Sequence, residues 1–399
     1  MGFIPITPGL GSIEKGRWRV IKETTEGVIP DFNDTGWQPF KIQSGAAITD
    51  TPTLIEIDPI RDTLSAYDTE IGKEVVAGEL PLYFEAPTTI GGPNDCDTML
   101  ELLFGSKHTT AAMTNAAIKD VNTIQVDAID PNLKVNDIIL LKITLDSVNY
   151  DYPVAVTSLN TTATPDEIGI FPPLPATATL NSTSIGAARH YTPKTGLPTG
   201  CIQRLEADDQ ILFSYPACRI SQGVFEMTPN NPLVPKFTVS GTYENEQDSF
   251  VDTYSPPSLG KSFVMKGARV LIDDEYKTWN ASVTVTYSNQ LGEKEGIEAA
   301  TGVSGHYENV RQITVALNFQ YNNAAERAKF RTAQSRKMLI YGSRTMDDGS
   351  IRCFAWYFPN LKATALTEPI TGRQKKYQMT ARAYQKDTNG DNEVCLSLF

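Results

Sequence analysis

The sequence lacks the marks of a membrane-bound or exported protein. It contains no run of about 20 apolar residues, the length that a membrane-spanning helix needs. Residues 1–19, MGFIPITPGLGSIEKGRWR, lack the basic start, the apolar core and the small-residue cleavage site of a secretory signal. Ile6 also stands where the myristoylation pattern requires Ser or Thr. We therefore expect a protein without membrane attachment.

Cysteine is scarce, with five residues in 399. Cys96, Cys201, Cys218, Cys353 and Cys395 lie far apart and include no CxxC pair, so neither a disulfide framework nor a zinc site is indicated. Free and largely buried thiols of a protein made in the cytoplasm are the favoured interpretation. A bridge between Cys201 and Cys218 is the one pairing that merits a test.

Groups that carry catalysis are also few. The three histidines, His108, His190 and His306, are not placed with a nucleophile or a carboxylate in a catalytic arrangement, and surface or loop positions are favoured for them. There is no GxSxG, P-loop or HExxH motif. DTNGDNE (387–393) resembles a calcium loop but lacks the closing glutamate, and its Asn-Gly step favours a hairpin turn. We predict no enzyme activity, no cofactor and no metal site.

Positive charge is in deficit: 35 basic residues face 47 acidic ones, which gives a formal net charge of −12. A surface of that sign repels phosphate, so groove binding of nucleic acid is disfavoured. The same charge is compatible with a protein past which DNA slides without sticking.

The residues that are abundant favour a β protein. Ser, Thr, Asn, Gly and Pro are frequent, and β-branched residues occur along the whole chain, a mixture typical of short strands joined by turns. The apolar fraction of 40% and the charged fraction of 21% are those of an ordinary soluble protein. The length permits two or three domains, each with its own core.

Alternation of apolar and polar side chains is clearest in the second half of the chain. It runs through WNASVTVTYSN (279–289) and RQITVALNFQYNN (311–323), and a period of two over such lengths predicts half-buried strands. The segment NNAAERAKFRTAQSRK (322–337) predicts a helix capped by Asn322 or Asn323, and KMLIYG then restores a strand.

The first half shows the same order of elements. Strand patterns at 55–57 and 76–84 precede DCDTMLELLFG (95–105), in which Asp95 or Asp97 can cap a short helix and Gly105 can end it.

The closing segments of the two halves can be aligned. Residues 213–244 match 356–385, with Tyr215-Pro216 against Phe358-Pro359 at an offset of 143, and Lys236-Phe237 against Lys376-Tyr377 at an offset of 140. A duplicated unit of the form strand–strand–helix–strand–strand is the economical explanation, and a chance likeness of two β segments is the alternative.

These observations predict a mainly β chain with two tandem β-sandwich or half-barrel domains, each with a flanking helix, and a small inserted β-barrel. The expected divisions are an extended N-terminal arm (1–43), a first domain (44–116 and 191–258), the insert (117–190) and a second domain (259–399). A polar, Gly-rich loop at about 289–312 separates two strongly patterned strands, and so long a connection is typically functional or disordered.

The segments IEIDPIRDTLSAYDTEIGKEVVAGELPLYF, DCDTMLELLFG and FSYPACRISQGVFEMTPNNPLVPKFTVSGTYE together resemble the tail tube proteins of long-tailed, non-contractile bacteriophages. The likeness covers most of residues 44–399 and depends on the order of elements and on scattered residues, with no diagnostic motif. Some members of that family carry the tube unit twice in one chain.

The resemblance implies a structural protein of the virion, assembled in the host cytoplasm. Its copies would join edge to edge into rings, three copies per ring if the unit is duplicated, and the rings would stack into a tube around a tape-measure protein. Other implied partners are the tail terminator and distal tail proteins, with phage DNA passing through without specific binding.

Two sets of residues then become candidates. Contacts between rings are expected in the long loop, at Leu291, Glu293, Lys294, Glu295, Glu298, His306, Tyr307 and Glu308. Mostly uncharged strand faces are candidates for the lumen, at Ser282, Thr284, Thr286, Thr314, Asn318 and Gln320.

Two other functions stay open at this point. One is another virion ring protein of the same fold, such as a distal tail, hub or tail-completion protein. The other is a β-sandwich adhesin or carbohydrate-binding module, which exposed aromatics clustered on one loop face would favour.

Overall fold

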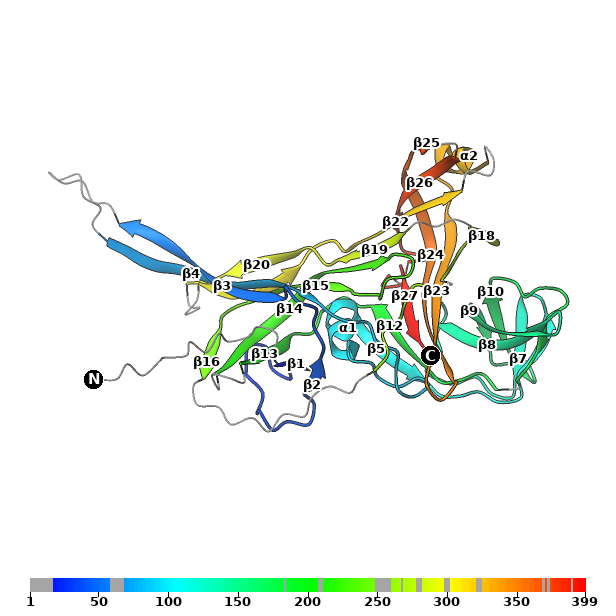
Figure 1. Ribbon diagram of the computed structural model, residues 1–399, viewed down its shortest axis with the longest axis horizontal. Helices are drawn as coiled ribbons and strands as arrows, with labels where there is room; N and C mark the ends of the chain where they lie inside the picture. Colours follow the sequence, from blue (N-terminus) through cyan, green and yellow to red (C-terminus); the bar gives the residue numbers. More distant parts are fainter. Residues whose placement is uncertain are drawn as a thin grey trace, which may run out of the picture.

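The computed structural model (Figure 1) describes residues 17–57, 68–182, 184–206, 211–247, 260–266, 268–277, 282–297, 302–320, 325–367, 370–371, 374–388 and 390–399. Within these residues the protein is mainly β, which confirms the predicted fold class. No helix in this part of the chain has the length and apolar character needed to cross a bilayer.

Nineteen strands of the described residues form one hydrogen-bonded sheet. It begins with a long hairpin, β3 (Ala47–Ile57) and β4 (Asp68–Pro81), which projects at the left of Figure 1. β4 pairs with β15 (Lys236–Gly241), and β15 pairs with the long strand β14 (Ile211–Met227).

The sheet continues into the second half of the chain. β14 also pairs with β19 (Val283–Ser288), which is followed in the sheet by β22 (Gln312–Gln320), β26 (Gln374–Ala383) and β24 (Ile351–Thr367). Beyond β24 the order is β23 (Arg336–Thr345), β17 (Arg269–Ile272) and β18 (Glu275–Lys277), and the short β25 (Ile370–Thr371) pairs with β26.

The N-terminal segment was predicted to be an extended arm, but its described residues form two strands of the large sheet. β1 (Arg17–Lys22) pairs with β13 (Gly200–Glu206) and with β2 (Gln38–Phe40), while β13 and β16 (Asn245–Gln247) both pair with β14. Trp18, Val20 and Phe40 are buried in the core. The isolated apolar residues of this segment therefore pack on the chain's own sheet, and residues 1–16 lie outside the described part.

Three strands connect the two halves near their common centre. β12 (Ala188–Pro193) lies between β5 (Gly105–Thr110) and β27 (Cys395–Leu398), and β27 pairs in turn with β24. All four residues of β27 are buried.

Residues 117–180 form a separate six-stranded sheet that is nearly closed into a barrel, as predicted. Its strands are β6 (Ala117–Asp120), β7 (Thr123–Val126), β8 (Ile138–Leu145), β9 (Val148–Asn160), β10 (Asp166–Phe171) and β11 (Thr179–Leu180). They enclose a core of their own that includes Ile124, Leu141 and Val154. This barrel lies at the right of Figure 1.

The helix α1 (Asp97–Phe104) packs against β14 and ends at Gly105, whose φ of 90° is the left-handed conformation expected of a glycine C-cap. The predicted aspartate cap is wrong. Cys96 holds the N-cap position and makes no side-chain capping hydrogen bond. Asp97 is the first helical residue, and its carboxylate is bound by Arg189, Lys107 and Tyr191. The second helix, α2 (Ala325–Arg331), is shorter than predicted, and Asn322 and Asn323 lie outside the described residues.

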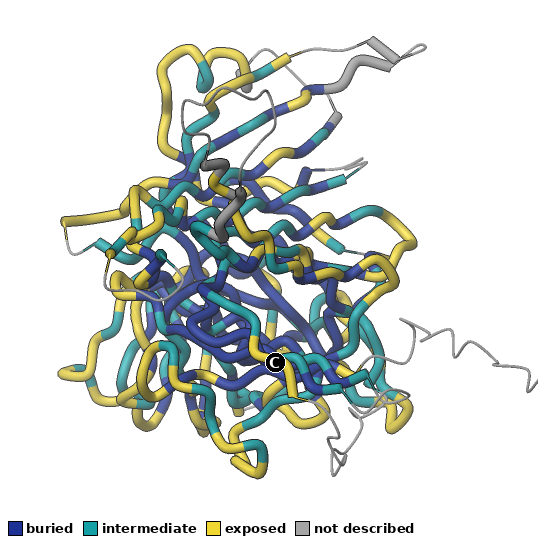
Figure 2. Tube along the Cα trace, turned by 90° about the vertical axis from the view of Figure 1, so that its left-hand side faces the viewer, coloured by how far each residue is buried: buried dark blue, intermediate teal, exposed yellow. Residues whose placement is uncertain are grey.

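One hydrophobic core joins the two halves of the large sheet, and buried residues concentrate at the centre of the molecule (Figure 2). Phe104 of α1 lies 5.7 Å from Trp356 of β24, and Phe225 of β14 lies 4.8 Å from the same ring. Aromatic pairs of this geometry stabilise beyond their buried area. The halves are therefore packed together as one body.

Candidate assembly surfaces

A continuous ladder of eight strands crosses the molecule in the order β3–β4–β15–β14–β19–β22–β26–β24. Every neighbouring pair in it is antiparallel. One face carries buried side chains such as Val76, Val239, Val285 and Met379. The other face of the ladder is open to solvent.

The residues that β19 and β22 place on the open face are small and mostly uncharged, whereas the neighbouring strands add Lys236, Lys362 and Arg382 to the same face. Five of the predicted lumen residues, Ser282, Thr284, Thr286, Thr314 and Asn318, are half-buried positions that alternate with the core positions of β19 and β22. Thr286 stands directly opposite Thr314 in the ladder. The side chain of Gln320 is outside the described part. The structure thus brings the five together on one face.

The two ends of the ladder are unpaired among the described residues. β3 pairs with β4 along one edge and has no partner along the other. β24 pairs with β23 only as far as Leu361, so Lys362–Thr367 have β26 on one side and no strand on the other. Unpaired edges expose rows of N–H and C=O groups and are templates for a further strand.

The segment predicted as a long loop is a hairpin in its described residues, which corrects that prediction. β20 (Leu291–Glu295) pairs with β21 (Val303–Glu308) and extends the β19–β22 pair. The sequence did not predict these strands, because their polar residues show no apolar–polar alternation although the backbone pairing continues. Glu298 lies outside the described residues.

The hairpin is fixed to the rest of the chain by ion pairs. Lys73 of β4 binds both Glu293 and Glu295. Glu308 accepts hydrogen bonds from the backbone N–H groups of Leu197 (2.5 Å) and Gly196 (3.2 Å). The β20–β21 hairpin therefore lies beside the β3–β4 hairpin, as Figure 1 also shows.

The predicted contact residues differ in their exposure. Lys294 and Glu295 are exposed, Tyr307 is 46% exposed, and Leu291 is half-buried. His306 is buried at 2% exposure, and burial lowers its pKa, so its side chain is covered by its own chain and is not available for a contact between rings.

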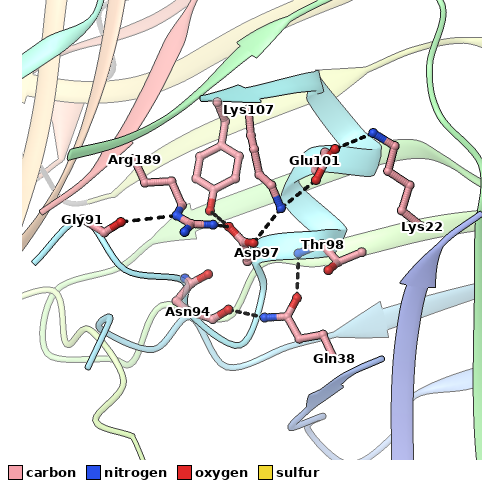
Figure 3. Close-up of polar contacts among 10 residues, drawn as sticks. Lys22, Gln38, Gly91, Asn94, Asp97, Thr98, Glu101, Lys107 and Arg189 are labelled. Carbon is pink, nitrogen blue, oxygen red and sulfur yellow. Dashed lines mark hydrogen bonds and ion pairs between the residues drawn. The ribbon is translucent and has the colours of Figure 1, made fainter. Parts of the chain in front are cut away.

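A buried ionic cluster fixes α1 to the sheet (Figure 3). The Asp97 carboxylate accepts hydrogen bonds from Arg189 (2.7 Å), Lys107 (2.8 Å) and the Tyr191 hydroxyl (2.5 Å). Burial by itself would raise the pKa of Asp97, but Lys107 and the other donors outweigh it and lower that pKa. Glu101 extends the cluster by binding Lys107 (2.7 Å) and Lys22 (2.6 Å).

The structure also brings together histidines that sequence reasoning left apart. His108 Nε2 in β5 lies 2.8 Å from a carboxylate oxygen of Asp137, which immediately precedes β8 of the barrel. His190 Nδ1 lies 2.8 Å from Ser397 and its Nε2 lies 3.2 Å from Thr110. The surface or loop positions favoured for the histidines are wrong for His190, which is fully buried in β12, and for His306, which is 2% exposed in β21. No local pattern signals this contact, because its members come from distant strands.

His108, Asp137 and His190 are the described group nearest to a metal site, with donor atoms within 4.8 Å of one another. Both His190 nitrogens contact hydroxyl groups and His108 Nε2 contacts Asp137, so these groups form a hydrogen-bond network that joins the barrel to β5, β12 and β27. His108 Nδ1 is buried without a hydrogen-bond partner. A cleft of about 470 Å³ is lined by ion-paired residues that include Arg311, Asp391 and Glu393.

The fold and its surfaces define a β protein whose prominent features are open strand edges and projecting hairpins. The chain belongs to the phage tail tube protein family, whose model matches residues 15–349. This finding confirms the resemblance inferred from the sequence and assigns the protein a structural role in a phage tail. No match was found among the curated proteins.

Proposed function

We propose that the chain is the subunit that polymerises into stacked rings and so forms the tail tube, the conduit through which DNA is ejected. The observation that carries the proposal is the eight-strand ladder with both ends unpaired, in a chain of the tail tube family. A ladder that ends in two free edges closes when copies join end to end, which removes the exposed edges.

The open face of the ladder suits a lumen. The threonines, serines and asparagine of β19 and β22 offer DNA no cationic grip, and the chain as a whole carries a net charge of −12. Cations of the same face lie on the neighbouring strands, where Lys236 is 3.7 Å from Glu79 and Arg382 stands opposite Thr314. On this proposal Ser282, Thr284, Thr286, Thr314 and Asn318 face the channel. The tape-measure protein occupies it during assembly, and the terminator and distal tail proteins cap its ends.

Matched irregularities in strand pairing support a duplicated tube unit. The β13–β14 register shifts between Ile202↔Tyr215 and Gly200↔Cys218, and the β23–β24 register shifts between Met338↔Phe358 and Arg336↔Leu361. The β14 and β24 residues at these shifts differ by 143 in both cases, the offset of the sequence alignment. Bulges are features of a particular fold, so their repetition at one offset favours common descent over chance.

A second pair of irregularities follows the same spacing. β14 bulges between Ile220 and Gln222 against β15, and β24 bulges between Ala363 and Ala365 against β26. The residues paired with Ile220 and Ala363 are Val239 and Ala381, which differ by 142. The ladder therefore aligns β15 with β26 two residues away from the Lys236-Phe237 match.

We assign the first unit to 44–116 with 191–258 and the second to 259–399, with 117–190 inserted in the first. Three chains would then supply six units, and a ring of three has pseudo-sixfold symmetry.

Electron microscopy of the concentrated protein tests the function. Tubes of uniform width with a threefold or pseudo-sixfold cross-section are expected. Single rings that never stack would indicate another virion ring protein, and a protein that stays monomeric would overturn the proposal.

A carbohydrate-binding module has less support. The exposed large aromatics of the described residues are Tyr276 in β18, Tyr307 in β21 and Tyr384 just after β26, so they belong to separate parts of the chain.

A further inference from the structure

The junction between the two units is a strand pairing within the chain. β14 uses one edge for β13, at Ile211–Cys218, and then pairs with β19 through Gln222–Met227. The first unit thus receives the opening strand of the second unit along the free end of its longest strand. Gln222 stands opposite Ser288 and Val224 opposite Thr286.

The second unit presents the same free end without an occupant. At the offset of 143, Gln222 corresponds to Ala365 and Val224 to Thr367 of β24. Among the described residues, β24 loses β23 at Leu361 and then has β26 alone. The position that β19 occupies on β14 is therefore vacant on β24.

The first unit presents the matching strand. Thr49 of β3 is equivalent to Thr286 of β19, and Thr51 is equivalent to Ser288. The equivalence is obtained by following the paired residues from β14 through β15 and β4 to β3 in the first unit, and from β24 through β26 and β22 to β19 in the second. β19 has partners on both edges, whereas β3 has β4 alone within the described chain.

Both hairpins that begin with these strands shift register by one residue toward their tips. β3–β4 does so between Pro52 and Leu54, and the second hairpin does so between the β19–β22 and β20–β21 pairings. This agreement supports the equivalence of β3 and β19.

We propose that β24 of one copy pairs antiparallel with β3 of the next, with Ala365 opposite Thr51, Leu366 opposite Asp50 and Thr367 opposite Thr49. The pairing between copies repeats the β14–β19 pairing within the copy, so three copies close the ladder into a ring. The proposal rests on the proposed function, and it names the surface and the register by which that function is performed.

Disulfide trapping tests the register. Thr49→Cys with Thr367→Cys is expected to link neighbouring copies into a covalent trimer, seen on a non-reducing gel and abolished by reductant. The matched intrachain variant, Val224→Cys with Thr286→Cys, is expected to form its bridge within one chain. The native cysteines are free and buried, so they do not interfere.

A shifted pair serves as control. Thr53→Cys with Thr367→Cys displaces one partner by four residues, about 13 Å along the strand, beyond the Cβ separation that a disulfide spans. Equal linking of this pair and the Thr49 pair would overturn the register.

The outcomes separate the two proposals. Tubes that form while the Thr49–Thr367 pair stays unlinked, with the Val224–Thr286 bridge present, would overturn the pairing and leave the proposed function intact. A wild-type protein that forms neither rings nor tubes at any concentration would overturn both.

Discussion

Replacing Asp97 by asparagine removes one charge from the centre of the ionic cluster while preserving its volume. The Asp97 side chain is 7% exposed, and its three donors come from β5 and β12. Asparagine keeps one carbonyl oxygen, but it places an amide group against Lys107 or Arg189. Both cations stay in place, and one of them loses its acceptor.

The expected cost follows from these contacts. Removing one partner of a buried ion pair destabilises by about 3–5 kcal/mol. Lys107 retains Glu101 at 2.7 Å and Arg189 retains the Gly91 carbonyl at 3.4 Å, so the lower end applies. We expect Asp97→Asn to lower the free energy of unfolding by about 3 kcal/mol. Adding Arg189→Met should recover part of the loss, because it removes the stranded cation.

Urea unfolding followed by tryptophan fluorescence measures the difference. The pKa of Asp97 is lowered in the folded state, so its contribution is complete above the ordinary carboxyl pKa of 3.8 and is lost as pH falls through the folded value. The gap between wild type and variant should therefore close in acid. The control is Glu79→Gln, at an exposed pair 3.7 Å from Lys236, with an expected effect below about 1 kcal/mol. Equal losses in the two variants would refute the reasoning.

Four further predictions concern other parts of the chain. Burial lowers the pKa of His190 to about 4 from 6.5, so its contribution to stability is complete above pH 6.5, and about 3 kcal/mol is lost as pH falls to 4. The urea midpoint of His190→Gln should lack this dependence on pH, and an unchanged dependence would contradict the prediction. Burial raises the pKa of Cys353 to about 12 and all five thiols are free, so a thiol reagent should label none before unfolding and five after it; fewer than five after unfolding would reveal a disulfide. Thr286→Lys adds a cation to the open face, and phage carrying it should eject DNA more slowly, most clearly at low salt, whereas Thr286→Ser should behave as wild type. Ile297, fully exposed just beyond β20, should contribute to ring stacking, so Ile297→Asp should give folded rings but shorter tubes in micrographs; tubes of normal length would count against a contact there.

The fold class and the strongest strands could be predicted because their pattern is local. Alternation of apolar and polar residues identified β19 and β22 to within about four residues, since one face of each is buried and the other is open. The same reasoning failed for β20 and β21, whose glutamates and glycines carry no alternation. Their pairing is imposed by the strands that they extend and by Lys73.

The remaining misses come from contacts that are distant in sequence. β1 could not be recognised in a segment rich in proline and glycine, because its partner β13 lies between 178 and 188 residues further along the chain. Asp97 has the residue type of a helix cap, but Arg189 and Lys107 reach it from other strands and take its carboxylate. The contact between His108 and Asp137 likewise exists only once the barrel is placed against β5.

The position of β27 between β12 and β24 has a consequence for synthesis on the ribosome. His190 and Ser397, which meet across the β12–β27 pair, are 207 residues apart. At a synthesis rate of about 5–20 residues per second, β27 is completed roughly 10–40 s after β12. During that interval the edge of β12 and the apolar side chains that β27 later covers are exposed in a nascent chain. Chains released before residue 395 would keep that surface open and are expected to be substrates for chaperones and proteases.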